Sequence, residues 1–345
     1  EMNNLPISNI TQGLAGRAPG LIVQGSGGGI NKTSSISIRG GDTPLIVIDG
    51  VIRDYSDFVA LNPEDVDVMS VLKDASATAV YGARATNGIL QITTKKGSSG
   101  KPSVEYNFNQ SWAQPNVWPD KLDAYNYAYY TREAQRYDGV TETYNEEDLQ
   151  KFRDGSDPLG HPNTNYYKLL LRNFAPQTKH SLRLSGGNQV NQYYASLSML
   201  NQRSLYRNDN NWMKRTNFQL SETTTIESIG LKINMQLDGY TQNQSHPLTS
   251  ESGSYQTVFA GIQDKSPITI GVNNFGLTST SSYNPVKFVA EDAGYTKKKE
   301  SVINGLLNME WNVPWVKGLK ARVKGSYRFY QKDNKDWSKE PAGYD

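Results

Sequence analysis

A glycine-rich segment near the start of the chain comes closest to a known chemical site. Residues 25–33 read GSGGGINKT, which at first sight resembles a phosphate-binding loop. Such a loop needs a glycine directly before its lysine, whereas Asn31 stands before Lys32. A dinucleotide fingerprint fails as well, because Ile30 and Lys32 fall where its final glycine should be. We therefore expect a flexible loop and no nucleotide site.

Residue types that serve catalysis or metal binding are sparse. The chain has no cysteine, which excludes thiolate nucleophiles, disulfides and Cys-ligated metals. The acidic run 146–148 follows Asn145, a pattern typical of a helix start rather than of a catalytic pair. The three histidines lack the spacing of metal ligands: His161, His180 and His246. We predict no catalytic residues, no metal site, no cofactor and no enzymatic activity.

The composition favours a β-rich protein of the cell surface. The 345 residues include 21 Tyr and 30 Gly, only 20% are charged, and the mean hydropathy is −0.64. A net charge of +2 gives no electrostatic footprint for nucleic acid. The longest apolar runs, such as Leu45–Ile48, are far shorter than the ~20 residues of a membrane-spanning helix. A membrane protein with this sequence would therefore have to be a β-barrel.

The first 97 residues predict a small mixed α/β domain. Two apolar runs flank Asp49-Gly50, which favours a type I′ hairpin. A compact strand–helix–strand unit follows, in which Gly82 can end the helix in the left-handed conformation. The expected elements are a strand at 34–39, the hairpin at 45–52, a helical turn at 62–65, a strand from 66 to 70, a helix at 75–81 and a strand at 89–94.

From residue 101 onward the chain changes to long strands with period-two alternation. The candidates are 101–112, 180–185, 191–200, 212–221, 228–240, 301–313 and 319–331. Their alternation suits an apolar face against lipid and a polar face toward a lumen. The last strand places four cations on its polar face: Lys320, Arg322, Lys324 and Arg328. This predicts a preference for anionic cargo, with pairing to acidic neighbours as the alternative.

Long and short connections alternate between these strands, and the longest are 113–179 and 241–300. This asymmetry is typical of outer-membrane barrels, whose periplasmic turns are short and whose extracellular loops are longer. A soluble β-sandwich is the alternative. Since seven strands are too few for a complete bacterial barrel, we expect the chain to be part of a longer protein.

Several motifs of the first 97 residues occur in a recognisable order. They are LPISNI at 5–10, LAGRAPG at 14–20, IRG at 38–40, PLIVIDGV at 44–51, NPED at 62–65, LKDASATAVYG at 72–82, TNGI at 86–89 and ITTKKG at 92–97. The series resembles the plug domain of the SusC/RagA family of TonB-dependent outer-membrane transporters. Later pieces, such as SGG at 185–187 followed by Tyr193-Tyr194, resemble the first barrel strands of this family.

The resemblance implies a fold and a function. The expected fold is an α+β plug domain at 1–98, followed at 99–345 by antiparallel strands of a transmembrane β-barrel of about 22 strands. It implies a cell outer-membrane location, a SusD-like lipoprotein lid, the TonB–ExbB–ExbD energy-coupling complex and contact with outer-membrane lipid. The cargo would be glycan oligosaccharides or, alternatively, peptides. A non-transporting surface binding protein or adhesin is the other class considered.

The resemblance also gives two candidate sites. The glycine-rich loop would lie in the plug, where Gly27, Gly28, Gly29, Asn31 and Lys32 are candidates for substrate binding. Arg39 would latch the plug to acidic groups on the inner barrel wall, with a solvated strand-end arginine as the alternative. The tyrosines of the 113–179 connection are expected to pack a loop helix at 122–136 and to form an aromatic belt, rather than to stack on sugars.

Overall fold

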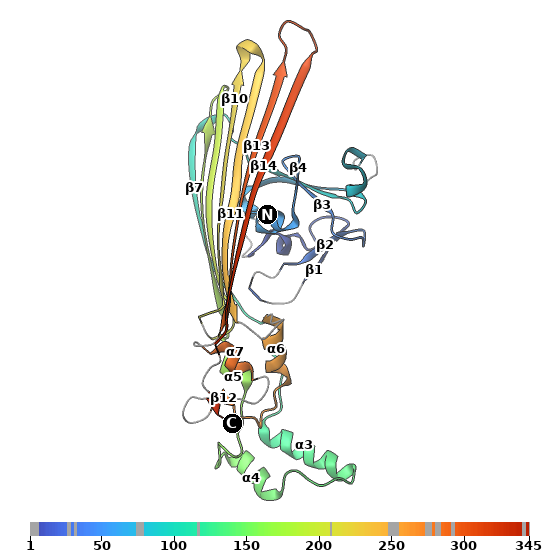
Figure 1. Cartoon of the computed structure of the whole chain (residues 1–345), viewed down its shortest axis with the longest axis vertical. Helices are drawn as coiled ribbons and strands as arrows, with labels where there is room; N and C mark the ends of the chain where they lie inside the picture. The colour runs from blue at the N-terminus through green and yellow to red at the C-terminus, as the bar shows by residue number, and fades with distance from the viewer. Residues whose placement is uncertain are drawn as a thin grey trace.

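A computed structural model shows an N-terminal domain set against one face of a long, curved sheet, with helical connections gathered at one end of that sheet (Figure 1). It describes residues 7–25, 29–30, 33–73, 79–115, 118–207, 209–247, 255–272, 278–279, 284–290, 294–339 and 343–344. Among these residues, no helix combines the length and the apolar character needed to cross a membrane.

The N-terminal domain is built on a four-stranded sheet of order β4-β3-β6-β5, in which β3 and β6 are parallel. A separate hairpin of β1 and β2 covers it. The elements are η2 (Ile10–Leu14), β1 (Leu21–Gln24), β2 (Ser35–Ile38), β3 (Leu45–Ile48), β4 (Val51–Arg53), α1 (Tyr55–Ala60), η3 (Pro63–Asp65), β5 (Val66–Leu72), η4 (Ala79–Ala85) and β6 (Ile89–Thr94). Their core contains Ile10, Ile36, Phe58, Leu90 and Ile92.

The predicted turns of this domain are confirmed in the described residues. Asp49 and Gly50 both have positive φ, 51° and 74°, as a type I′ turn requires. Asn62 caps the turn that Pro63 begins. The predicted helix at 75–81 falls mostly outside the described residues. Its described end is wrong in type, because 79–85 forms 3-10 turns interrupted at Gly82, where φ is 61°.

The long sheet contains seven strands, each antiparallel to the next and ordered as in the sequence. They are β7 (Gly100–Ala113), β8 (Ala175–Gly187), β9 (Asn191–Arg203), β10 (Trp212–Ile226), β11 (Leu231–Pro247), β13 (Tyr295–Asn312) and β14 (Lys320–Trp337). The seven predicted strands are therefore confirmed, and most are longer than predicted. Regular alternation continues past the predicted ends as polar residues, which hydrophobic periodicity does not mark.

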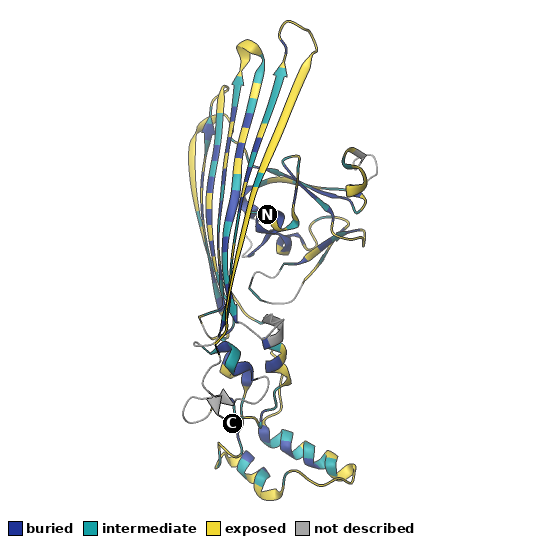
Figure 2. Cartoon of the chain, viewed as in Figure 1, coloured by how far each residue is buried: buried dark blue, intermediate teal, exposed yellow. Residues whose placement is uncertain are grey.

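The two faces of the long sheet have opposite character (Figure 2). The face toward the N-terminal domain buries polar side chains, among them Ser196, Asn217, Gln219, Asn234, Gln236 and Asn304. The other face exposes apolar ones, among them Leu197, Met199, Leu220, Met235, Leu237, Ile303 and Leu307. A β-sandwich would bury its apolar face against a second sheet, so this alternative is wrong.

Long and short connections lie at opposite ends of the sheet (Figure 1). The short ones include η5 (Glu227–Ile229) between β10 and β11. The long ones carry α3 (Ala124–Tyr137), α4 (Glu146–Asp154), α5 (Tyr166–Leu170), α6 (Tyr255–Asp264) and α7 (Pro285–Val289), together with the two-residue strand β12 (Thr278–Ser279). The two-residue strand β15 (Gly343–Tyr344) follows β14 and pairs with β12. The predicted loop helix at 122–136 is confirmed as α3.

The helical loops have a polar junction around His161. Its ring nitrogens lie 3.0 Å from Asp148 Oδ1 and 2.9 Å from Asp157 Oδ2. These carboxylates raise the pKa of His161 through their hydrogen bonds. Asn145 and Asp148 form a capping box at the start of α4, which confirms the predicted helix cap. Among the described residues, no group of three or more His, Cys, Asp or Glu side chains has an arrangement that could hold a metal ion.

Candidate functional site: the interface between the N-terminal domain and the long sheet

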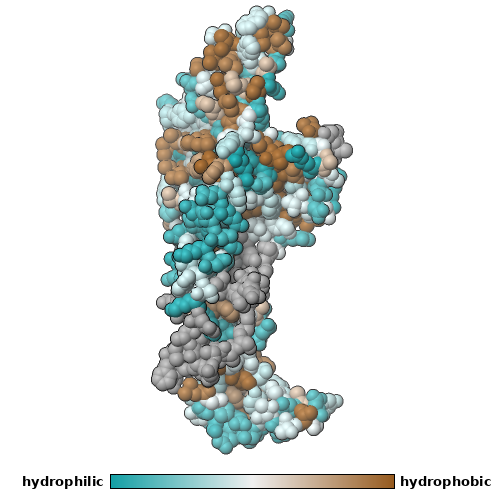
Figure 3. Space-filling model, in the orientation of Figure 1, coloured by the Kyte–Doolittle hydropathy of each residue, from teal (hydrophilic) through white to brown (hydrophobic). Residues whose placement is uncertain are grey.

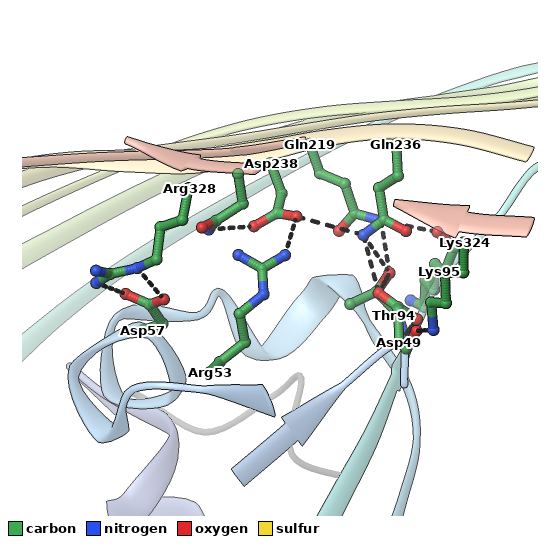
Figure 4. A network of polar contacts seen from close by, with 11 residues as sticks. Asp49, Arg53, Asp57, Thr94, Lys95, Gln219, Gln236, Asp238, Lys324 and Arg328 are labelled. Carbon is green, nitrogen blue, oxygen red and sulfur yellow. Dashed lines mark hydrogen bonds and ion pairs between the residues drawn. The ribbon is translucent and has the colours of Figure 1, made fainter. Parts of the chain in front are cut away.

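The turn between β3 and β4 places Asp49 at the centre of a polar network (Figure 4). Asp49 Oδ2 accepts hydrogen bonds from Thr94 Oγ1 and from Gln236 Nε2, both at 2.8 Å. Gln219 Nε2 donates to Thr94 Oγ1 at 3.0 Å. From β14, Lys324 Nζ donates to the Asp49 carbonyl at 2.6 Å. Three strands of the long sheet thus hold one tight turn.

Beside this network, Arg53 at the end of β4 reaches the sheet as a buried cation. Its Nη2 lies 3.2 Å from Asp238 Oδ1, and the two side chains are 4% and 18% exposed. Asn304 Nδ2 donates to the other carboxylate oxygen of Asp238 at 2.9 Å. Because both charges are largely removed from water, loss of either partner would leave the other without compensation.

In a second ion pair the domain supplies the carboxylate and the sheet supplies the cation. Asp57 in α1 accepts from Arg328 Nε at 3.0 Å and from Arg328 Nη2 at 2.9 Å, a two-point contact (Figure 4). The Asp57 side chain is only 4% exposed. Asp54, which is 66% exposed, lies 3.0 Å from the same Nη2. Arg328 therefore ties α1 to β14.

The η3 turn docks on β8 and β9. Glu64 accepts a hydrogen bond from Ser181 Oγ at 3.2 Å and pairs with Lys179 Nζ at 2.9 Å. Tyr194 OH donates to Asp65 Oδ1 at 2.8 Å. Burial raises the pKa of Asp65, while the hydrogen bond from Tyr194 opposes the rise. The acidic turn that the sequence predicts is thus a contact with the sheet.

Among the described residues, one cluster of buried apolar side chains crosses the interface and joins Ala60 to Tyr240 and Val302. The other contacts described above are hydrogen bonds and ion pairs, and water can replace these partners when the surfaces separate. Each such bond contributes a net ~0.5–1.5 kcal/mol, so the domain is held by many modest contacts. An interface of this composition keeps the domain in place and still lets it be displaced.

The interface contacts described above involve neither of the predicted site residues that the structure describes, Gly29 and Arg39. Gly27, Gly28, Asn31 and Lys32 lie outside the described residues. Gly29 is described and has φ 145°. Arg39 is exposed in the turn after β2, with φ 53°, and its backbone N–H donates to Gly20 O at 3.2 Å. The binding role of the loop and the latch role of Arg39 stay predictions.

The sequence did not predict most of the ion pairs and hydrogen bonds between the N-terminal domain and the long sheet, which join charged residues of the two parts. They are Arg53, Asp57, Glu64 and Asp65 of the domain and Lys179, Arg183, Asp238 and Arg328 of the sheet. The cationic face of β14, predicted to attract anionic cargo, gives two members to the interface: Lys324 and Arg328. The other two do not reach it: Lys320 is exposed, and Arg322 Nε lies 3.5 Å from Glu310. For Arg328, the alternative prediction is confirmed: its guanidinium pairs with the acidic residues Asp54 and Asp57.

A sheet with an apolar exterior and a polar interior, closed on that inner side by a hydrogen-bonded domain, defines a plugged β-barrel of the outer-membrane class. The comparisons with known proteins agree. Residues 1–89 match the family described as TonB-dependent Receptor Plug Domain. The seven antiparallel strands that follow are the first part of a barrel wall.

Two curated relatives are TonB-dependent receptors. The chain is 33% identical to TonB-dependent receptor SusC of Bacteroides thetaiotaomicron over 226 residues, or 61% of this chain and 20% of that protein. It is 28% identical to TonB-dependent receptor P26 of Formosa agariphila over 278 residues, or 74% of this chain and 27% of that protein. The chain thus spans about a quarter of the length of these relatives or less.

A solved structure shows the same fold over the whole chain. The RagAB peptide importer in its "closed-closed" state superimposes with a TM-score of 0.73 at 22% identity, covering 100% of this chain and 41% of the other. The plug-domain match and the two sequence relatives confirm the resemblance to TonB-dependent receptors of the SusC/RagA family. The solved structure confirms the fold, a plug domain followed by antiparallel strands of a barrel wall.

Proposed function

We propose that the protein is an outer-membrane importer that moves oligomeric nutrients into the periplasm without breaking a bond. The observation that carries the proposal is the polar interface: hydrogen bonds and ion pairs hold the plug inside the wall and little apolar surface seals it. Energy from a TonB–ExbB–ExbD complex in the inner membrane would displace the plug. The functional boundary between plug and barrel would lie at residue 98, two residues before β7 begins.

Oligosaccharides are the cargo class we favour, because the resemblance to the SusC/RagA family implies glycan oligomers as the commonest cargo. Peptides are the second candidate, favoured by the fold shared with a peptide importer. A SusD-like lipoprotein would close the extracellular mouth over the helical loops. The glycine-rich loop 25–33 would face the cargo, and Arg39 would steady the plug beside it.

A reversible tether tests the proposal. Asn217 Nδ2 donates to the Ala60 carbonyl at 2.6 Å across the interface, and this chain has no cysteine of its own. Cysteines placed at both positions of the full-length transporter can be joined by a short thiol cross-linker that a reductant cleaves. We expect cross-linked cells to stop importing labelled oligosaccharide or peptide, and to resume after reduction.

The two single-cysteine variants, treated in the same way, are the reference. They carry the same labels without a tether, so their uptake should be unaffected by reduction. Import at the untethered rate while the plug is cross-linked would overturn the proposal. Uptake of peptides but not of oligosaccharides would leave the importer intact and reverse the preferred cargo.

A further inference from the structure

A row of lysines lies on the outer face of the long sheet, at the end that carries the long connections. The register of β10, β11, β13 and β14 places Lys214 and Lys299 on either side of Asn243, and Lys297 directly opposite Lys335. All four lysines are exposed. They lie on the same face of the sheet as the exposed Leu220, Leu237 and Ile303 further along the strands. The row thus continues the lipid-facing side of the sheet.

Among the described strand residues, little negative charge lies beside the lysines of this row. Asp333, opposite Lys299, is the one acid at this height on the outward positions of the described β9–β14 strands. Like charges directly opposite each other on neighbouring strands are destabilising, as they are at Lys297 and Lys335. The outward positions of these described strands nearer the short turns hold no lysine or arginine. On the outward positions of these described strands, positive charge therefore lies only toward the end of the sheet that carries the long connections.

The height of the row matches the lipid headgroups. Trp311 lies on the same face near the short turns, at the opposite end of β13. With a rise of about 3.4 Å per residue and a strand tilt of about 40°, Lys299 lies about 31 Å from Trp311 along the membrane normal. The hydrocarbon core is about 30 Å thick or slightly less, so the lysines begin where the lipid phosphates lie.

Aromatic rings interleave with the lysines, as they do at a membrane–water boundary. Lys214 Nζ lies 5.5 Å from the Trp212 ring centroid, and Lys297 Nζ lies 4.3 Å from that of Tyr295. The Tyr295 ring packs against Trp337 at 5.6 Å. Figure 3 shows hydrophilic residues gathered toward this end of the visible face, with apolar residues above them. These aromatic rings therefore support a position of the lysine row at the membrane–water boundary.

We propose that this lysine row binds the phosphate groups of an anionic lipid of the outer leaflet. The inference rests on the proposed outer-membrane placement and goes beyond transport. Ammonium groups on two adjacent strand pairs can share one phosphate-bearing headgroup, which relieves the repulsion between Lys297 and Lys335. The apolar band beneath holds the acyl chains of the same lipid.

Lipid binding to the full-length protein in neutral detergent tests the proposal, with bis-phosphorylated lipid A and its dephosphorylated form as probes. The variant Lys297→Gln with Lys335→Gln should weaken binding of the phosphorylated probe roughly thirtyfold, at about a fivefold loss for each lysine near a charged surface. The control Lys298→Gln with Lys332→Gln removes the same charge from inward positions of the same strands. It should bind within twofold of the unchanged protein.

Several results would overturn the lipid site. They are equal binding of both probes, equal weakening by both double variants, or binding of an acidic polysaccharide in place of the lipid. Uptake measured on the same variants separates this proposal from the transporter function. Unchanged uptake with unchanged lipid binding would sink the lipid site alone, whereas a plug tether without effect on import would sink the transporter.

Discussion

Replacing Asp57 by Asn removes one carboxylate from the two-point contact with Arg328 while keeping the shape of the side chain. Asp57 is 4% exposed and Arg328 is 29% exposed. Breaking a fully buried pair costs ~3–5 kcal/mol. Asp54 remains 3.0 Å from the same guanidinium, and Arg328 keeps some water, so we expect a smaller loss of about 2 kcal/mol. This corresponds to roughly a thirtyfold shift toward the undocked state of α1.

Hydrogen exchange of the full-length protein measures this shift. The backbone N–H groups of Asp57 and Phe58 both bond to the Asp54 carbonyl, so their exchange reports the opening of α1. Asp57→Asn should speed their exchange roughly thirtyfold. The matched control is Asp54→Asn, which alters an exposed partner of the same Arg328 and should change exchange less than about fivefold. Equal, small effects of both variants would refute the view that the buried pair holds the plug.

Three further predictions follow from the structure. Gly97→Ala should sharply lower the yield of folded barrel, measured by heat-modifiable migration, because a Cβ there would overlap the backbone of Tyr193; Gly305→Ala, where a Cβ meets nothing, is the control. Asn145→Ala should destabilise α4 by about 1 kcal/mol, seen as faster amide exchange in that helix alone. The raised pKa of His161 means that its stabilising charge is fully present below about pH 6.5 and is lost as the pH rises through the elevated value; loop exchange that is flat with pH over this window would contradict it.

Local chemistry explains why the framework could be predicted from the sequence. Asp49-Gly50 specifies its turn through backbone conformation alone, and the alternation around Leu231–Leu237 marks a strand without knowledge of its neighbours. The alternation also assigns the faces, because a strand that borders lipid must be apolar on that side. These features depend on residues adjacent in the chain.

The plug contacts depend on residues far apart in the chain. Asp57 and Arg328 are separated by most of the sequence, and nothing near either residue marks the other. In the sequence alone, a cation on an inward strand position is equally consistent with contact to cargo and with an ion pair to the plug. The first strand, β1 (Leu21–Gln24), was not predicted because its residues, LIVQ, do not alternate between apolar and polar. The described end of the predicted helix forms 3-10 turns, whereas the positive φ of Gly82 falls where the sequence placed the end of that helix.

In an outer-membrane barrel, neighbouring residues of each strand face lipid and lumen in turn. Spin labels placed singly at Leu237 and Gln236 of the full-length protein in membranes measure this alternation, because these adjacent residues lie on opposite faces of β11. The label at Leu237 should collide with oxygen dissolved in lipid and be shielded from an aqueous nickel reagent. The label at Gln236 should show little contact with lipid oxygen. Equal oxygen accessibility at both positions, or aqueous exposure of Leu237, would show that the apolar face of the sheet does not face lipid.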